Sequence, residues 1–174
     1  MIANASPLII FGKLNKISIL KSLYKTIEIT NEVYKETVLK GLEKNSPDAF
    51  IVKEHIDNKY IEVFKLDDKH LVLANKIQTI YNIDIGEAET IALAYQLNKK
   101  EIIIDEISAR QAAKAFGIKP IGSLRVLLAA YRNNLIKKSE VYSLINEMEN
   151  SKYRLSPQVL IEFWELFGRM KKDL

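Results

Sequence analysis

The chain has 174 residues, of which 48% are hydrophobic and 28% charged, a composition typical of a soluble globular protein with one sizeable core. It contains no cysteine and only two histidines, which excludes disulfides and thiolate zinc sites and leaves carboxylates as the natural cation ligands. The formal charge of +4 is compatible with nucleic acid binding, but on charge alone scattered surface lysines explain it better. No apolar run approaches the roughly 20 residues of a bilayer span, and the amino terminus lacks a signal-peptide pattern, so we expect a cytoplasmic protein without membrane contact.

The first half of the sequence alternates between helical and strand patterns. Ser6 followed by Pro7 is a helix-start signal, and Asn31 and Asp67 are candidate caps of later helices. The triplet Asn45-Ser46-Pro47 breaks a helical pattern. We predict helices over 8–14, 17–23, 31–42, 47–58 and 67–81, and strands over 26–30 and 60–66.

The second half continues the alternation. We predict helices over 87–97, 107–116, 124–133, 138–150 and 157–171, and strands over 102–104 and 118–121, with Gly117 ending one helix. Strands that alternate with helices favour a parallel sheet between two helical layers. The predicted fold is therefore a three-layer α/β/α sandwich with a central parallel sheet and extra C-terminal helices. We expect the sandwich over residues 1–136 and a helical extension over 137–174, packed on the same domain.

The segment Glu101–Glu106 is the most informative single stretch. Its run of three isoleucines predicts a strand covered on both faces, and the acid Asp105 follows directly. In open parallel sheets the ligand crevice lies just outside the carboxyl ends of the strands. Asp105 is therefore predicted to face a ligand or a metal ion.

Other polar side chains fall near the same predicted edge. They are Asn4 after the first segment, Glu36 one turn into a helix, and Glu87 and Glu89 after Gly86. Each has a plainer explanation: Asn4 as a turn residue, Glu36 as a solvated side chain, and the two later glutamates as partners of a helix dipole. Glu106 is explained most simply as a helix-start residue. Brought together, such oxygen ligands would suit Mg²⁺ or Mn²⁺, which activate water for attack on phosphate.

Other patterns carry weaker signals. The glycines form neither a dinucleotide fingerprint nor a phosphate loop, and no serine has the context of a nucleophile elbow. One group could form a basic-aromatic rim for RNA or simply a solvated helix end: Tyr131, Arg132, Lys137 and Lys138. A second group, at helical spacing, could pack internally or contact a partner: Leu160, Phe163, Trp164 and Phe167.

Several blocks between residues 2 and 136 carry a family resemblance. The blocks are Asn4–Ile9, Val33–Glu36, Gly86–Ala94, Ile104–Glu106 followed by Ala109-Arg110, Gly117–Leu124 and Asn134–Ile136. They resemble the PIN-domain nucleases, and more closely a toxin-like prokaryotic branch of that superfamily. The Gly-Glu-Ala-Glu block and the Asp-Glu-x-x-Ala-Arg block are the most specific.

The resemblance implies an acidic pocket for Mg²⁺ or Mn²⁺ and hydrolysis of RNA phosphodiester bonds. It also implies that an antitoxin protein and a second copy of the chain are candidate partners. Carried over by position, the metal ligands are Asn4, Glu36, Glu87 or Glu89, and Asp105, with Glu89 preferred for the third position and Glu36, Glu89 and Asp105 as the catalytic acids. The residues that would contact RNA are Ser6, Arg110 and Ser123.

One position departs from the family pattern. The first ligand is usually Asp in active members, and here it is Asn4. One missing charge about 4 Å from a cation corresponds to roughly 4 kcal/mol at an effective dielectric near 20, before solvent and other ligands reduce it. A catalytically weak or inactive RNA-binding module therefore stays an alternative, and a protein-interaction module working through the last helix is a third hypothesis.

Overall fold

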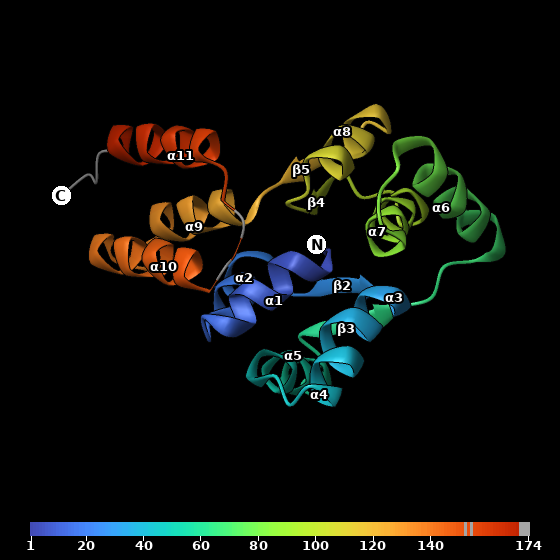
Figure 1. Ribbon diagram of the computed structural model, residues 1–174, viewed down its shortest axis with the longest axis horizontal. Coiled ribbons are helices and arrows are strands. Elements are labelled where there is room, and N and C mark those ends of the chain that lie inside the picture. The colour runs from blue at the N-terminus through green and yellow to red at the C-terminus, as the bar shows by residue number, and fades with distance from the viewer. Residues whose placement is uncertain (152, 154, 171–174) are drawn as a thin grey trace. The chain divides into compact units, whose positions relative to one another are not determined.

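The computed structural model describes residues 1–151, 153 and 155–170 (Figure 1). The chain divides into two compact units, Met1–Ser123 and Leu124–Leu174. The predicted domain boundary at residue 136 lies within the second unit, and it stays a prediction because compact units need not fold alone. Among the described residues, no helix combines the length and the apolar character that crossing a membrane requires.

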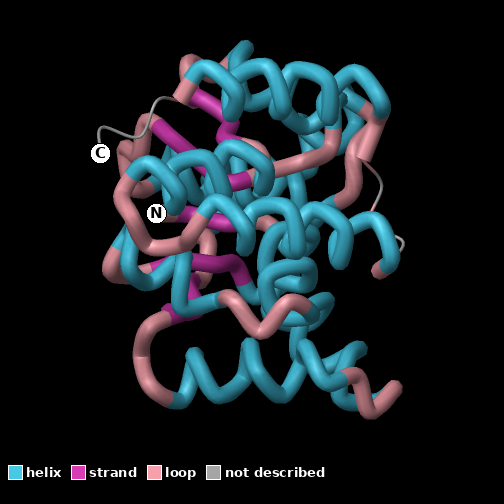
Figure 2. The backbone as a smooth tube through the Cα atoms, turned by 90° about the vertical axis from the view of Figure 1, so that its left-hand side faces the viewer, coloured by secondary structure: helices cyan, strands magenta, loops and turns pink. Residues whose placement is uncertain are grey.

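The first unit is built on a five-stranded sheet whose paired strands all run parallel. Figure 2 shows the strands in magenta. The strand order is β3-β2-β1-β4-β5. The strands are β1 (Ile2–Ala3), β2 (Ile27–Thr30), β3 (Ile61–Phe64), β4 (Glu101–Ile103) and β5 (Lys119–Ile121). Their isoleucine-rich sequences suit a sheet that is covered on both faces, since Ile2, Ile29 and Ile102 are fully buried.

Helices connect successive strands. Between β1 and β3 lie α1 (Ala5–Lys13), α2 (Ile17–Tyr24), α3 (Asn31–Tyr34), the π-helical segment η1 (Lys35–Leu39), α4 (Lys40–Glu43) and α5 (Pro47–Asp57). Between β3 and β5 lie α6 (Asp68–Tyr81), α7 (Ile85–Gln96) and α8 (Ile107–Ala115).

The direction of the chain across the sheet assigns these helices to two faces. From β1 to β3 the chain moves toward one edge, and from β3 through β4 to β5 it moves the opposite way. Right-handed crossovers then put α1–α5 on one face and α6–α8 on the other. The packing agrees: α7 contacts β1, β2 and β4 together with α6 and α8, whereas α1 packs against α5 and α2 against β2. The predicted three-layer α/β/α fold with a central parallel sheet is confirmed.

The reversal of direction creates a switch point between β1 and β4. The backbone N–H of Asn4 donates to the carbonyl of Ile103 at 2.9 Å, and Ala3 is in register with Ile103. Asn4 and Asp105 therefore follow two adjacent strands at the same edge of the sheet. Ligand crevices of open α/β sheets form at such points.

Three details of the predicted elements were wrong. Helix α1 is capped by Asn4 rather than Ser6, because the helix begins two residues earlier than the proline suggested. Helix α3 is capped by Thr30 rather than Asn31, since the Thr30 hydroxyl accepts the N–H of Val33 at 3.2 Å. The predicted helix 31–42 is interrupted by the wider turn of η1. The cap at Asp67, the break before Pro47 and the left-handed Gly117 after α8 are confirmed.

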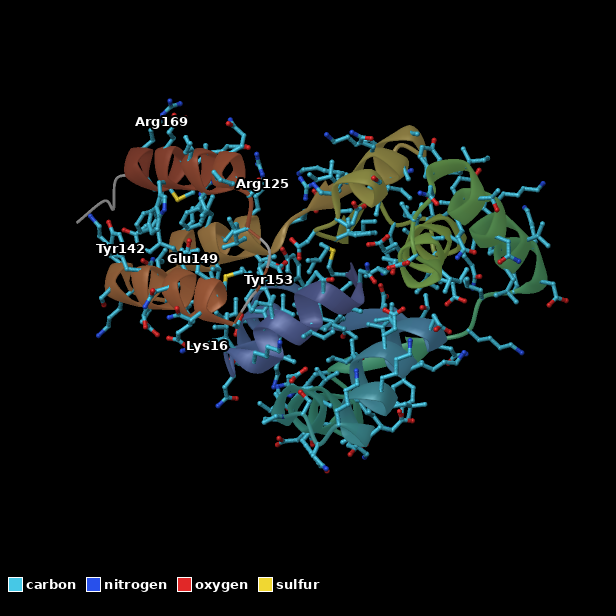
Figure 3. The ribbon with its side chains drawn as sticks, in the orientation of Figure 1. Lys16, Arg125, Tyr142, Glu149, Tyr153 and Arg169 are labelled. Atoms are coloured by element: carbon cyan, nitrogen blue, oxygen red, sulfur yellow. The ribbon has the colours of Figure 1, made fainter. Side chains whose placement is uncertain are left out.

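The described helices of the second unit are α9 (Ser123–Arg132), whose first residue belongs to the first unit, α10 (Lys138–Asn150) and α11 (Pro157–Arg169). Phe163 and Phe167 of α11 are buried, and the Phe167 ring lies 4.9 Å from Tyr131 and 5.7 Å from Tyr142. The internal packing predicted for this aromatic stripe is confirmed for these two rings. Figure 3 shows Arg169 extending outward at the end of α11. The predicted helix end at Lys171 lies outside the described residues.

A candidate acidic site at the carboxyl edge of the sheet

Glu36 and the start of α7, which are far apart in the sequence, meet at Gly86. A Cβ atom added to Gly86 would lie 3.0 and 3.1 Å from the two carboxylate oxygens of Glu36. The missing side chain therefore lets the Glu36 carboxylate rest against the first turn of α7. This contact brings together two of the blocks that carry the family resemblance.

Glu36 reaches this position from the π-helical segment η1. A π turn is wider than an α turn, so it redirects the side chains that follow, and such turns occur often at functional sites. The buried hydroxyl of Thr37 donates to the carbonyl of Val33 at 2.8 Å, which binds the segment to α3. The irregular turn is thus fixed by hydrogen bonding and by burial of Thr37 and Val38.

The surroundings of Glu36 disfavour its charge. Burial raises the pKa of the Glu36 carboxyl, and the nearby acids Glu32, Asp84 and Glu89 raise it further, against the opposing effect of Lys40. Like charges close to a partly buried carboxylate store electrostatic energy that a bound cation would release.

Glu87 shows the same effect more strongly. Burial raises the pKa of its carboxyl to about 7, with Glu106, Asp84 and Glu36 adding to the shift. One opposing contribution comes from the N–H of Asp84, which donates to Oε2 of Glu87 at 3.1 Å and closes a capping box at the start of α7. Glu87 therefore lies within electrostatic range of acids from η1, α7 and the start of α8.

Two hydrogen bonds from Ser123, the first residue of the helix that follows β5, hold the side chain of Asp105. The N–H of Ser123 donates to Oδ1 and its hydroxyl donates to Oδ2, both at 2.7 Å. Arg110 lies close by, with Nη1 donating to the carbonyl of Ile104 at 3.1 Å. A Cβ on Gly122 would lie 3.1 Å from that nitrogen and 3.3 Å from Oδ1 of Asp105, so the guanidinium and the carboxylate flank the same glycine.

The other predicted site residues lie at the same edge but have structural partners or weaker contacts. Asn4 is 3% exposed, and its Oδ1 accepts the N–H of Ala5 at 2.6 Å, so the amide oxygen caps α1. Ser6 is exposed in the first turn of α1.

Glu89 is half-buried, and its charge acts on Glu36 and on Lys35. The charge of Glu89 acts on Glu36, and the charge of Glu36 acts on Glu87, so the preference for Glu89 as the third ligand stays a prediction.

The donor chemistry of this site fits a hard divalent cation. All the candidate ligands supply oxygen, and after burial, the main cause, other nearby carboxylates raise the pKa values of Glu36 and Glu87 further. Within the described part of the chain, however, no three His, Cys, Asp or Glu side chains stand close enough to hold a metal ion ready-made. The assignment of Asn4, Glu36, Glu87, Glu89 and Asp105 as metal ligands stays a prediction.

Sequence reasoning missed Asp84 and the role of the π turn. Asp84 acts on both Glu36 and Glu87, and the Asp-x-x-Glu spacing of a capping box is a signal that would have found it. Glu106, expected as a helix-start residue, caps α8 by accepting the N–H of Ala109 at 2.6 Å. No sequence pattern indicated η1.

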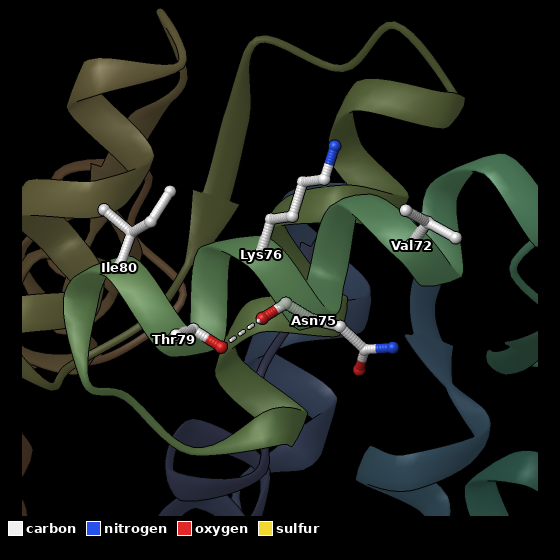
Figure 4. Close-up of a pocket in the computed structure, with 5 residues that line it drawn as sticks. All are labelled: Val72, Asn75, Lys76, Thr79 and Ile80. Carbon is white, nitrogen blue, oxygen red and sulfur yellow. Dashed lines mark hydrogen bonds between the residues drawn. The ribbon is translucent and has the colours of Figure 1, made fainter.

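A separate hollow lies on the outer face of α6 (Figure 4). It measures about 360 Å³ and is lined by Val72, Asn75, Lys76, Thr79 and Ile80. The hydroxyl of Thr79 donates to the carbonyl of Asn75 at 2.9 Å, as in many helix interiors. None of these five side chains is acidic, so the hollow is distinct from the acidic site.

The first unit is an α/β fold with carboxylates at the carboxyl edge of its parallel sheet, the edge at which such sheets bind ligands. The profile of the family DUF3368, a PIN domain, matches residues 1–169, and the chain belongs to this family. PIN domains are generally nucleases, which generally use divalent metals. A search of curated proteins found no match.

Proposed function

We propose that the chain is an endoribonuclease that hydrolyses RNA phosphodiester bonds with Mg²⁺ or Mn²⁺. The observation that carries this proposal is the Glu36 carboxylate resting on Gly86, beside a Glu87 whose pKa is raised to about 7. A pair of partly buried carboxylates from distant segments is costly for the fold, and binding of a cation explains why both are present.

The chain's own residues would divide the work between metal binding and phosphate binding. Glu36, Asp105 and one or both of Glu87 and Glu89 would hold the ion, with Asn4 as a neutral ligand once its oxygen leaves the cap. When bound, the ion lowers the pKa of a coordinated water and stabilises the charge that develops on the phosphate. Arg110 lies next to Asp105 and would pair with a phosphate oxygen, as an arginine fork does well.

Ser123 and Ser6 have supporting roles. Ser123 orients both oxygens of Asp105 and would release one of them to the ion. Ser6 is exposed at the start of α1, close in sequence to Asn4, and would donate to the RNA backbone.

The test is cleavage of a labelled single-stranded RNA in the presence of Mn²⁺. We expect turnover by the unaltered chain and its loss in excess EDTA or after Asp105→Asn. Asp68→Asn, which alters an exposed acid at the start of α6, serves as the control and should cleave normally. Cleavage that survives Asp105→Asn or EDTA would remove the proposed mechanism.

A second candidate function is a non-catalytic RNA-binding or regulatory module. Asn4 favours it, because this residue brings no charge and its oxygen already caps α1. This alternative predicts salt-sensitive RNA binding without turnover at millimolar Mn²⁺.

We propose that the protein acts as a toxin in the cytoplasm. Its proposed partners are an antitoxin protein and a second copy of the chain, with which it forms a homodimer. The exposed Val159 and Ile161 of α11 offer apolar area for such a contact. A short upstream gene for a small DNA-binding protein would support the toxin role, and size-exclusion chromatography would test the dimer. Removing the residues after Ser156 should abolish antitoxin binding and leave cleavage intact.

A further inference from the structure

Lysines gather at the amino ends of the strands, on the edge of the sheet opposite the acidic site. Lys59 precedes β3, Lys25 precedes β2, Lys99 and Lys100 precede β4, and Lys119 opens β5. Because the strands are parallel and adjacent in the order β3-β2-β1-β4-β5, these lysines follow one another along a single edge. Four inter-strand spacings make this edge about 19 Å long.

A sixth lysine joins the same edge. Lys21 of α2 places its Nζ 3.3 Å from the ring centroid of Tyr60, the residue directly before β3. We call the six residues the lysine row: Lys21, Lys25, Lys59, Lys99, Lys100 and Lys119.

Only part of the positive charge of the lysine row is neutralised. Lys99 pairs with Glu28 at 2.8 Å and Lys119 with Glu101 at 2.7 Å. Glu62 of β3 is a third glutamate near this edge, which gives six lysines against three glutamates. Lys25, Lys59 and Lys100 are exposed, and no carboxylate in the described part of the chain forms a salt bridge with any of the three.

The backbone at two of these lysines is strained. Seven non-glycine residues among those described have positive φ; five are asparagines, which tolerate that region, and the other two are Lys25 and Lys59. Lys25 has φ 64° and ψ −61°, and the N–H of Thr26 donates to the carbonyl of Tyr24 at 2.8 Å, which forms a tight three-residue turn of the rare, strained kind. A lysine at a position that suits asparagine or glycine better indicates that its charge is used.

A hollow opens within the lysine row. It measures about 540 Å³, with Tyr24 and Lys25 on the β2 side and Lys99, Lys100 and Glu101 on the β4 side. This volume lies in the range of small-molecule pockets. The hollow would therefore accommodate one nucleotide. Tyr24 is half-buried there and offers an aromatic ring, the kind of surface on which single-stranded bases stack.

We propose that the lysine row binds the phosphates of single-stranded RNA, as a second contact surface apart from the acidic site. That the polyanion is RNA rests on the proposed function. Cations along one edge of the sheet, beside a nucleotide-sized hollow with a tyrosine, suit a nucleic acid strand better than an acidic protein. Strands of at most four residues separate the two edges, about 13 Å, so one RNA molecule can contact both.

The test compares two triple variants with equal loss of charge. The row variant carries Lys25→Asn, Lys59→Asn and Lys100→Gln, and the control carries Lys69→Gln, Lys76→Gln and Lys114→Gln, three exposed lysines of α6 and α8. Binding of a fluorescein-labelled 20-nucleotide oligouridylate is followed by anisotropy in EDTA at several salt concentrations.

We expect the row variant to lose at least tenfold in affinity near 0.1 M salt, and the control less than twofold. The slope of log affinity against log salt should fall by about 2 in the row variant, at roughly 0.7 per lost phosphate contact. The melting temperature of the row variant should stay the same or rise, because asparagine suits positive φ better than lysine. A folded variant therefore separates lost binding from lost structure.

Several outcomes would overturn the proposal. They are no RNA binding by the unaltered chain, equal losses in both variants, or no loss in the row variant. Displacement of RNA by low-millimolar inorganic phosphate at constant ionic strength would assign the hollow to a small anion, and tighter row-dependent binding of polyglutamate would assign the row to an acidic protein. Cleavage in Mn²⁺ is measured on the same samples: row-dependent binding without cleavage contradicts only the proposed function, and cleavage with row-independent binding contradicts only the lysine row.

Discussion

The two edges of the same sheet have opposite character. At the carboxyl edge, Glu36, Glu87 and Asp105 come from helix starts and strand ends, and burial or hydrogen bonding holds each of them in place. At the amino edge, lysines stand before the strands, mostly exposed and only partly paired. Because all paired strands run parallel, every strand contributes one end to each edge.

The difference shows how such a fold separates two kinds of electrostatic task. Exposed cations interact with a polyanion through solvent at little cost to folding, so they need no buried support. Carboxylates that concentrate charge must be held against their mutual repulsion, which takes glycines, caps and an irregular turn. Changes at the carboxyl edge should therefore affect catalysis and stability together, whereas changes in the lysine row should affect binding.

The largest effect is expected from Glu36→Gln. Removing this charge should lower RNA cleavage at least about 100-fold, the usual loss when one electrostatic contact to the reacting centre disappears. The melting temperature at pH 7 should stay the same or rise, because the pKa of Glu36 is raised by burial and by neighbouring acids.

The matched control is Glu32→Gln on the preceding turn, where Glu32 pairs with Lys35 at 2.8 Å. It should keep most of the cleavage rate. Equal losses in both variants would mean that general charge, rather than the position of Glu36, matters.

The second change, Asn4→Asp, restores the missing charge. Aspartate caps helices as well as asparagine does, so α1 should persist. Mn²⁺ affinity measured by calorimetry should rise about tenfold, a solvent-reduced fraction of the roughly 4 kcal/mol that one charge can supply at 4 Å.

Without metal, the same variant should unfold at a lower temperature, because it adds a carboxylate to an acidic edge. Asn15→Asp, in the turn after α1, is the control. If both variants bind Mn²⁺ equally well, Asn4 does not face the ion.

Gly86→Ala probes the contact between Glu36 and α7. The new methyl would lie 3.0 Å from a Glu36 oxygen and displace that flexible carboxylate, so cleavage should fall about tenfold. Stability should change by less than about 1 kcal/mol, because alanine favours the helix by a similar amount.

Gly168→Ala is the matched control, since a Cβ there meets no atom within 4 Å among the described residues. It should leave cleavage unchanged. Normal cleavage by Gly86→Ala would show that the Glu36 carboxylate need not rest on this glycine.

The last prediction concerns stability rather than catalysis, namely the pH dependence of stability in the absence of metal. The folded pKa of Glu87 is raised from 4.5 to about 7, so the folded state binds a proton more tightly than the unfolded chain. Stability from this group is fully present below about pH 4.5 and is lost as the pH rises through about 7. The full shift corresponds to roughly 3.4 kcal/mol, which solvent screening of a partly buried carboxyl reduces to about 2–3 kcal/mol.

Urea unfolding at several pH values, without metal, measures this loss. Glu87→Gln should flatten the profile and keep the capping bond to the N–H of Asp84, whereas the exposed Glu54→Gln should leave the profile unchanged. A Glu87→Gln profile as steep as that of the unaltered chain would contradict the burial of this charge.

Much of the acidic edge could be predicted from the sequence. Asp105 follows a run of isoleucines, and a strand that is buried on both faces leaves only its carboxyl end for an acid. The Gly-Glu-Ala-Glu block also placed Glu87 and Glu89 at a helix start, where acidic side chains interact favourably with the helix dipole. Local patterns of this kind specify helices and strands because burial and capping act within a few residues.

What escaped prediction depends on contacts between distant segments. The π turn that carries Glu36 has no sequence pattern, and the use of the Asn4 oxygen as a cap depended on where α1 begins. The lysine row was invisible because its members lie at the amino ends of four different strands and in α2, and only the strand order makes them neighbours. The +4 charge alone could not distinguish such a row from scattered lysines.

The central claim is that acids from distant segments share one divalent ion at the carboxyl edge. The most direct measurement is anomalous diffraction from a crystal soaked in Mn²⁺. We expect a manganese peak bound by oxygens of Glu36 and Asp105 together with Glu87 or Glu89. A chain that binds no manganese there at millimolar concentration, or binds it only elsewhere, would contradict the claim.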